Sequence, residues 1–180
     1  NVHALEVASN GNLIAAGAFT QAGAAAASRI ARWNSTNVSA GTTWSALGAG
    51  LNGTARSVDT QPNGDVIVGG EFTEAGGATA NHVARWNGAA WSALATGVDD
   101  IFSEGVARAI KALPGGDTAV GGFFTNAGSA TATHIAIWNG SAFEALGQGL
   151  DDVVYELEPM SNGDVLVAGA FSGAGGVRTN

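Results

Sequence analysis

Residues 63–73 read Asn-Gly-Asp-Val-Ile-Val-Gly-Gly-Glu-Phe-Thr, an apolar run between an Asn-Gly turn signal and a Gly-x-Phe-Thr motif. The motif Gly-x-Phe-Thr/Ser occurs in four copies, at residues 17–20, 70–73, 122–125 and 169–172. Self-similarity of this kind is the sequence signature of a repeat architecture. The chain is therefore expected to be built from copies of one structural unit.

The period of the repeat is about 47 residues. The motif phenylalanines, Phe19, Phe72, Phe124 and Phe171, are separated by 53, 52 and 47 residues. The first interval contains six extra residues between its two tryptophans, and the second contains five extra residues before its next apolar strand. Without these insertions each interval is 47 residues long.

One repeat is predicted to form four antiparallel β-strands. In the second copy, strands are expected at residues 55–60, 65–73, 82–86 and 91–94, with Asn63-Gly64 forming a type I′ hairpin turn. Val66, Ile67 and Val68 run together, as expected of a strand covered on both faces. Similar turns are expected at residues 10–11, 115–116 and 162–163. Helices in the alanine-rich loops 22–27 and 75–80 would contradict this interpretation, since alanine favours helix.

Radially repeated four-stranded sheets predict an all-β fold, a β-propeller whose blades protect one another's edges. Three full blades are expected at about 2–48, 55–95 and 107–147, with a partial fourth at 154–180 and the whole forming part of a larger propeller. The recurring rings are interpreted as core: Trp33, Trp86, Trp138, Trp44, Trp91 and Phe143. The recurring glycines are interpreted as close contacts between blades: Gly17, Gly70, Gly122 and Gly169.

These motifs carry a family resemblance. The stretch 63–73, with His82 to Gly88 and Trp91 to Leu94, resembles the kelch-like and delta-60-type β-propeller repeats of large secreted or surface-exposed bacterial proteins. The resemblance covers essentially the whole chain. It implies an extracellular or cell-surface module for binding, adhesion or structural support. A distant similarity to the propeller of galactose oxidase implies no oxidase activity, because the cysteine needed for that copper site is absent.

Composition excludes several function classes. The 180 residues carry a formal net charge of −8 with seven Lys and Arg, which argues against a nucleic-acid partner. Cysteine is absent, so disulfides, thiolate metal sites and a cysteine nucleophile are excluded. No apolar run approaches the roughly 18 residues of a membrane span.

Candidate ligand-binding residues come from positions that vary between the copies. In a propeller, the loops from strand 2 to 3 and from strand 4 to the next blade share one face. The residues on this face that we consider candidates are His3, Arg56, Arg108 and Tyr155 opening the inner strand, His82 and His134 opening strand 3, and Asp99, Asp100, Glu104, Asp151 and Asp152 in the loops. Polar side chains that differ between equivalent positions are what a ligand-binding channel mouth would show, although a solvated rim with surface salt bridges would look similar.

The sequence gives no metal or cofactor signature. No Asp-x-Asp-x-Asp-Gly series is present for calcium, and His82 and His134 have no third ligand in register. No nucleophile elbow accompanies the serines. We therefore expect no catalytic residues, no metal and no cofactor.

The leading hypothesis is a non-enzymatic extracellular propeller segment that acts as a binding, adhesion or assembly scaffold. Its ligand is a protein or a carbohydrate, and further blades or neighbouring subunits pack at both chain ends. One alternative is the propeller domain of a polysaccharide-active enzyme, which needs converging carboxylates about 5 to 10 Å apart with a shifted pKa. Another alternative is a structural subunit of a surface layer, with the insertion at 35–43 as its contact.

Overall fold

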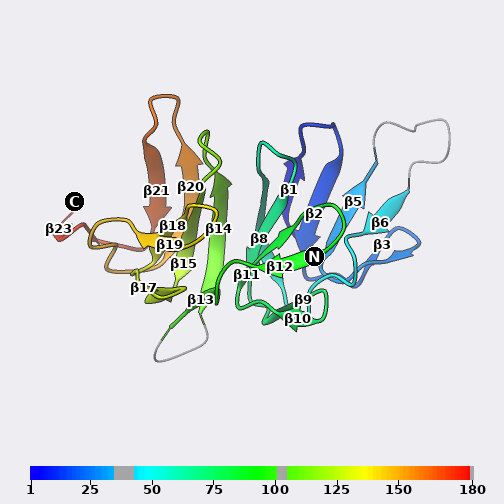
Figure 1. Cartoon of the computed structure of the whole chain (residues 1–180), viewed down its shortest axis with the longest axis horizontal. Coiled ribbons are helices and arrows are strands. Elements are labelled where there is room, and N and C mark those ends of the chain that lie inside the picture. Colours follow the sequence, from blue (N-terminus) through cyan, green and yellow to red (C-terminus); the bar gives the residue numbers. More distant parts are fainter. Residues whose placement is uncertain (35–42, 101–104, 179–180) are drawn as a thin grey trace.

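The computed structural model describes residues 1–34, 43–100 and 105–178. Three four-stranded antiparallel sheets follow one another along the chain (Figure 1). Blade 1 comprises β1 (Val2–Val7), β2 (Leu13–Gly17), β5 (Ile30–Trp33) and β6 (Trp44–Ala46). Blade 2 comprises β7 (Ala55–Thr60), β8 (Val66–Gly70), β11 (Val83–Trp86) and β12 (Trp91–Ala93). Blade 3 comprises β14 (Val106–Ala112), β15 (Thr118–Phe123), β18 (Ile135–Trp138) and β19 (Phe143–Ala145), and blade 4 contributes β20 (Val154–Pro159) and β21 (Val165–Gly169).

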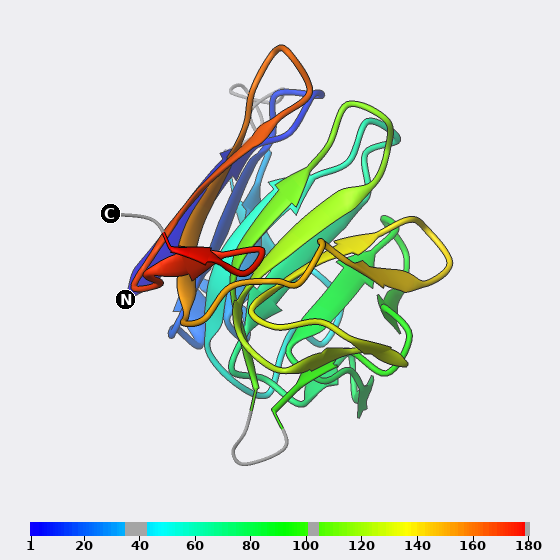
Figure 2. The same ribbon diagram turned by 90° about the vertical axis from the view of Figure 1, so that its left-hand side faces the viewer.

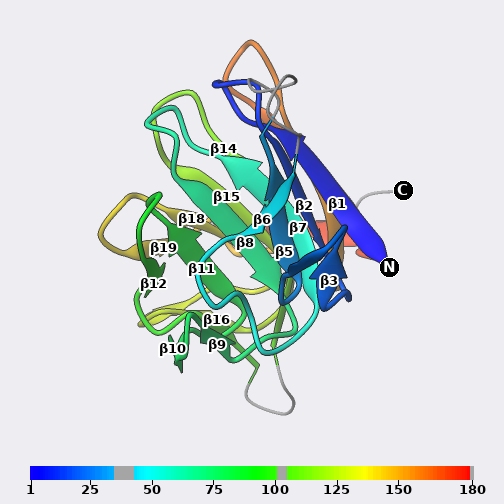
Figure 3. The same ribbon diagram turned by 90° about the vertical axis from the view of Figure 1, so that its right-hand side faces the viewer.

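The first strands of the four blades lie side by side in the order β1, β7, β14, β20. Figure 2 views the blades from the blade 4 side and Figure 3 from the blade 1 side, where β1 lies at one edge and β12 and β19 at the other. Four-stranded sheets that repeat radially around their first strands are the blades of a β-propeller, as predicted. The inner hairpins turn at the upper edge of Figure 1, and the loops from strand 2 to strand 3 of blades 2 and 3 lie at the lower edge.

Each interface between blades is an apolar core. The face of β8 that points toward blade 1 places Val66 and Val68 against Ile14 and Leu47, and Phe72 is fully buried there. Phe124 occupies the same place between blades 2 and 3. This arrangement explains why the apolar residues of the second strand do not alternate: both of its faces are covered by neighbouring sheets.

The inner hairpin turns differ in one respect from the prediction. A type I′ turn requires positive φ at both central residues. In the turn that closes β7 and β8, the N–H of Gly64 donates to the carbonyl of Gln61, and Gly64 has φ 88°, whereas Asn63 is not in the left-handed region. Asn63 instead accepts a 3.0 Å hydrogen bond from the N–H of Asp65. The Asn-Gly pair is therefore the end of a longer turn in which only glycine takes positive φ.

The alanine-rich loops form small β-hairpins whose strands are two residues long. The described residues contain no helix. These hairpins are β3 (Gln21–Ala22) with β4 (Ala25–Ala26), β9 (Glu74–Ala75) with β10 (Ala78–Thr79), β16 (Asn126–Ala127) with β17 (Ala130–Thr131), and β22 (Gly173–Ala174) with β23 (Val177–Arg178). β13 (Val98–Asp99) pairs with β16. Alanine side chains are small enough to sit between blades, as Ala75 and Ala127 do. Packing between blades here outweighs the helix preference of alanine.

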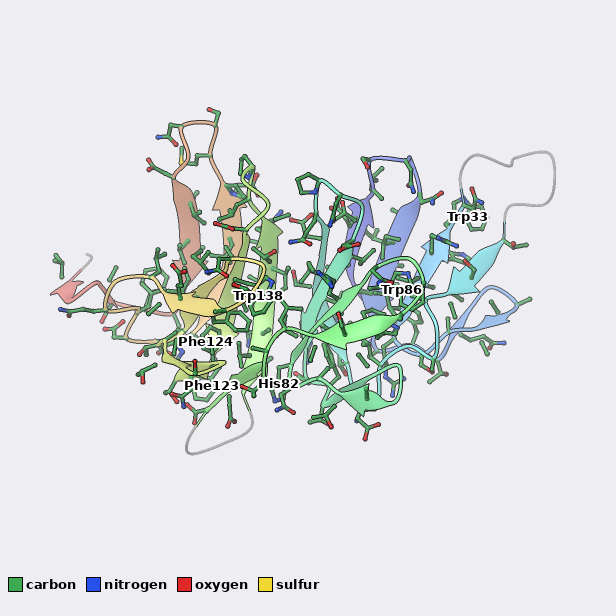
Figure 4. The ribbon with its side chains drawn as sticks, in the orientation of Figure 1. Trp33, His82, Trp86, Phe123, Phe124 and Trp138 are labelled. Atoms are coloured by element: carbon green, nitrogen blue, oxygen red, sulfur yellow. The ribbon has the colours of Figure 1, made fainter. Side chains whose placement is uncertain are left out.

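The recurring rings form one pair in each blade, and their burial is uneven. Ring centroids are 5.4 Å apart in Trp33–Trp44 and in Trp86–Trp91, and 5.0 Å apart in Trp138–Phe143. Only the third pair is buried on both members; the others are half-buried. Figure 4 shows Trp138 within the molecule and Trp33 at its outer edge. The prediction of a uniform ring core was therefore too strong, because strands 3 and 4 lie at the outside of each blade.

Candidate functional site

A β-bulge places one residue of each inner strand outside the strand ladder. In blade 2 the register passes from Ala55 opposite Gly70 to Ser57 opposite Gly69, which leaves Arg56 without a cross-strand partner. The same shift occurs in the other three blades, and the four extra residues are His3, Arg56, Arg108 and Tyr155. Bulges of this kind redirect a side chain from its sheet. The candidate residues that open the inner strands are thus the bulge residues.

The recurring motif glycine belongs to this bulge. A Cβ atom on Gly70 would collide with the carbonyl oxygen of Thr54, which precedes β7 in the same blade. Gly17, Gly122 and Gly169 meet the equivalent carbonyls of Asn1, Val106 and Val153. The interpretation of these glycines as contacts between blades was therefore wrong. Close approach to the next blade occurs one residue earlier in the two middle blades, where Cβ atoms on Gly69 and Gly121 would collide with Ile110 and Val154.

The four bulge residues line one cavity of about 420 Å³ between the inner strands. His3, Arg56 and Arg108 contribute basic side chains, and Tyr155 contributes a ring that is 54% exposed. Glu6, Lys111 and Glu156 line the same cavity, and the sequence analysis did not select them. The signal that could have found them is the register of the inner strand, since Glu6 and Lys111 both stand three residues after a bulge residue. We call this cavity the channel and the bulge end its mouth.

The two arginines at the mouth have different surroundings. Arg56 donates from Nε and Nη2 to Oε1 of Glu71, at 3.0 and 2.6 Å. Arg108 has no acidic partner among residues 1–34, 43–100 and 105–178; its Cζ lies 5.9 Å from the ring centroid of Tyr155. The position of Glu71 is occupied in blade 3 by Phe123, which is 36% exposed. One arginine is therefore neutralised within its own blade and the other is not.

Beyond the bulges the channel is lined by Glu6 and Lys111. Burial, and then the negative charge of Asp59, raise the pKa of Glu6 above its ordinary value of 4.5, although Thr60 donates a hydrogen bond to its carboxylate. Lys111 forms a 3.3 Å ion pair with Glu158. The channel therefore has a basic mouth, and beyond the bulges it carries Glu6 together with Lys111, whose ammonium is paired with Glu158.

The histidines that open strand 3 are structural. His82 and His134 are buried, with φ of 66° and 65°, and the backbone N–H of each donates to the carbonyl of the motif phenylalanine. The His134 ring lies 5.5 Å from the Phe123 ring. Figure 4 places His82 and Phe123 at the end of the sheets that carries the small hairpins. Neither histidine lines the channel, so their part in ligand binding stays a prediction.

The loop carboxylates do not converge on the channel either. Asp151 accepts hydrogen bonds from the N–H groups of Ser172 and Gly173, and these bonds lower its pKa below the ordinary value of 3.8. Asp152 accepts from the N–H of Val153. Asp99 is exposed on β13 and Asp100 is buried, while Glu104 lies outside the described residues. None of the four described carboxylates lines the channel, so their part in ligand binding stays a prediction.

Among the described residues no three His, Asp or Glu side chains are grouped as ligands for a metal ion. No helix in the described part of the chain could cross a membrane.

A protein-family model supports the fold class. The model of a family described as "Domain of unknown function (DUF5122) beta-propeller" matches residues 61–88. Among solved structures, the chain is similar to "YCF48 bound to D1 peptide", with 15% identity, a TM-score of 0.49, and coverage of 93% of this chain and 45% of that one. It is also similar to the extracellular domain of the putative one component system BT4673 from B. thetaiotaomicron, with 8% identity, a TM-score of 0.42, and coverage of 95% and 26%. The chain thus spans less than half of these structures, and no curated protein matches it.

Proposed function

We propose that this β-propeller segment is a non-enzymatic binding scaffold whose ligand sits at the channel mouth. The observation that carries the proposal is the bulge: four blades place His3, Arg56, Arg108 and Tyr155 outside their ladders and into one cavity. The frame around them repeats, but these side chains do not. Variable side chains on a repeated frame are the arrangement by which propeller blades form a tailored site.

The setting proposed for this scaffold is extracellular or at the cell surface, within a kelch-like or delta-60-type repeat array. The low content of charged residues (12%) and the absence of cysteine are compatible with an exported bacterial protein. Adhesion and assembly are the roles that such a module would serve, with a protein or a carbohydrate as ligand.

Further blades or neighbouring subunits are proposed to pack on the outward face of blade 1. Phe19 is half-buried there, whereas its equivalents Phe72 and Phe124 are fully buried by a preceding blade. Val2 and Leu5 on β1 are more than half exposed. An apolar sheet face of this kind is ordinarily covered. Light scattering of the 180-residue chain should show association; a monodisperse monomer would contradict this part of the proposal.

An enzyme remains the second candidate because of Glu6, a channel carboxylate whose pKa is raised by burial. A partially buried acid can serve as a general acid. Its neighbour Asp59 is less suited to a catalytic role. The carboxylate of Asp59 accepts hydrogen bonds from the backbone N–H groups of Thr60 and Ala112, each at 2.8 Å. Hydrolysis of a glycan panel that is lost in Glu6→Gln would favour this candidate.

The binding proposal is tested by NMR titration of the ¹⁵N-labelled chain with peptide and glycan panels. Ligands should shift the amide signals of the mouth, and Arg56→Ala with Arg108→Ala should weaken binding while leaving the melting temperature nearly unchanged. Arg85→Ala is the control, since Arg85 lies on β11 and pairs with Asp65 at 3.7 Å, away from the channel. Ligands that bind equally well to the double variant would place the site elsewhere.

A further inference from the structure

Blades 2 and 3 differ in the residue that stands beside the bulge arginine. This difference indicates which class of ligand the channel binds. In blade 2 the bulge arginine meets Glu71, and in blade 3 it meets a position occupied by Phe123. Phe123 packs instead on the buried ring of His134. The exchange of an acid for a ring thus leaves one guanidinium at the mouth whose charge no described carboxylate compensates.

The side chain of Arg108 is also oriented by a contact with an aromatic ring. Its guanidinium lies over the Tyr155 ring, 5.9 Å from the centroid, in a cation–π contact. Its Nε atom is buried and has no hydrogen-bond partner among the described residues. Buried donors in folded proteins are nearly always paired, so an unpaired one calls for a partner. A guanidinium held by one face offers its edge N–H groups, which match a carboxylate bidentately.

The opposite end of the same cavity favours a positive group. Glu6 lines it, and the ammonium of Lys111 is already paired with Glu158. Burial raises the pKa of Glu6, and the negative charge of Asp59 raises it further; a cation beside Glu6 would relieve this repulsion. His3 and Glu6 stand three residues apart on β1, which corresponds to about 10 Å along a strand.

A channel with a free arginine at its bulge end and a carboxylate about 10 Å further along the strands fits a ligand with both charges. A uronic acid supplies the carboxylate but no cation, whereas a short peptide supplies both. We propose that the channel binds a peptide whose carboxylate is held by Arg108 and whose ammonium group faces Glu6. This inference rests on the proposed binding function and assigns its ligand class.

The test is an NMR titration of the 180-residue chain with lysyl-alanyl-alanine, its C-terminal amide, and trigalacturonic acid. The peptide acid should shift the mouth signals, and amidation should weaken binding about tenfold or more, as expected for the loss of a charge-assisted hydrogen bond. Arg108→Gln should lower the affinity for the peptide acid by a similar factor and leave the affinity for the amide nearly unchanged.

Two further variants exploit the difference between the blades. Glu71→Gln should tighten binding of the peptide acid, because it releases Arg56 from its ion pair. Phe123→Glu should weaken binding, because it gives Arg108 the acid that blade 3 lacks. Arg85→Gln controls for net charge, and thermal melts confirm that each variant is folded.

The outcomes separate this inference from the binding proposal. Equal affinities for acid and amide, or an unchanged affinity in Arg108→Gln, would overturn the carboxylate assignment. Shifts of the mouth signals by trigalacturonic acid alone would overturn the peptide while leaving a ligand site at the mouth. Shifts confined to residues outside the channel, with every probe, would refute both proposals.

Discussion

The indole Nε1 of Trp91 donates a 2.7 Å hydrogen bond to the carbonyl of Leu47. This bond joins the outer strand of blade 2 to the end of blade 1, so the ring serves both packing and an interblade contact. Trp91→Phe should keep most of the packing and lose the bond, which would lower the free energy of unfolding by about 1 kcal/mol. Urea unfolding measures the change.

Trp44 provides the matched control for this prediction. It stands at the same repeat position in blade 1, and no hydrogen bond from its indole is present among the described residues. Trp44→Phe should therefore cost less than Trp91→Phe. Equal costs would mean that the bond to Leu47 contributes nothing measurable.

Trp138→Ala should destabilise the chain by about 3 to 5 kcal/mol, because its ring is buried between blades 2 and 3. Trp33→Ala should cost clearly less, since its ring is half-buried at the outer edge of blade 1. Thermal or urea unfolding of the two variants compares the same change at equivalent positions. A larger loss at Trp33 would show that the outer edge is covered in solution.

Asp151 should make one loop sensitive to acid. Its hydrogen bonds with Gly173 and Ser172 lower its pKa in the folded chain, so the stabilisation is present above the ordinary value of 3.8 and is lost as the pH falls through the lowered value. Amide exchange of Ser172 should accelerate over that range.

Asn52 shows what the control should be. Its side-chain oxygen accepts the N–H groups of Thr73 and Glu74 at 2.9 Å, the same bonds that Asp151 makes in blade 4. Asp151→Asn should therefore keep the loop contacts and remove their dependence on pH. Persistence of the acid transition in this variant would assign it to another group.

Glu6→Gln should stabilise the chain slightly at neutral pH. The pKa of Glu6 is raised, so its favourable contribution is complete below the ordinary value of 4.5 and is lost as the pH rises through the folded value. Because the side chain is only partly buried, solvent screens the effect, and we expect a gain of a few tenths of a kcal/mol at pH 7 and none near pH 3. Melting temperatures of wild type and variant at both values check this, with Glu74→Gln as a surface control.

The fold was predictable from sequence because the same apolar run, turn signal and ring positions recur at one period. Repetition is less informative about the turn type: the Asn-Gly pair occurs in several turns, and whether asparagine itself takes positive φ depends on the length of the loop. The uneven burial of Trp33 and Trp138 was not predictable either, since it depends on which neighbouring sheet covers each ring.

The candidate site was predictable in part. Variation between the copies selected Arg56 and Arg108, and the structure brings both to the channel. The same criterion also selected His134 and Asp151, whose backbone bonds recur in other repeats. The N–H of His134 donates to Phe124 as that of His82 donates to Phe72, and Asp151 accepts the bonds that Asn52 accepts in blade 2. Glu6 was missed because a bulge shifts the alternation of the inner strand, and a bulge has no clear signature in a single sequence.

The bulge also bears on how such a chain could be engineered. A residue outside the ladder has no cross-strand neighbour to satisfy, so the frame tolerates exchange there while the opposing glycine stays fixed. A combinatorial library that randomises only His3, Arg56, Arg108 and Tyr155 would sample many mouth chemistries on one scaffold. Each blade would then contribute one exchangeable ligand-contacting residue. New binding specificities could be selected without redesigning the sheets that carry these residues.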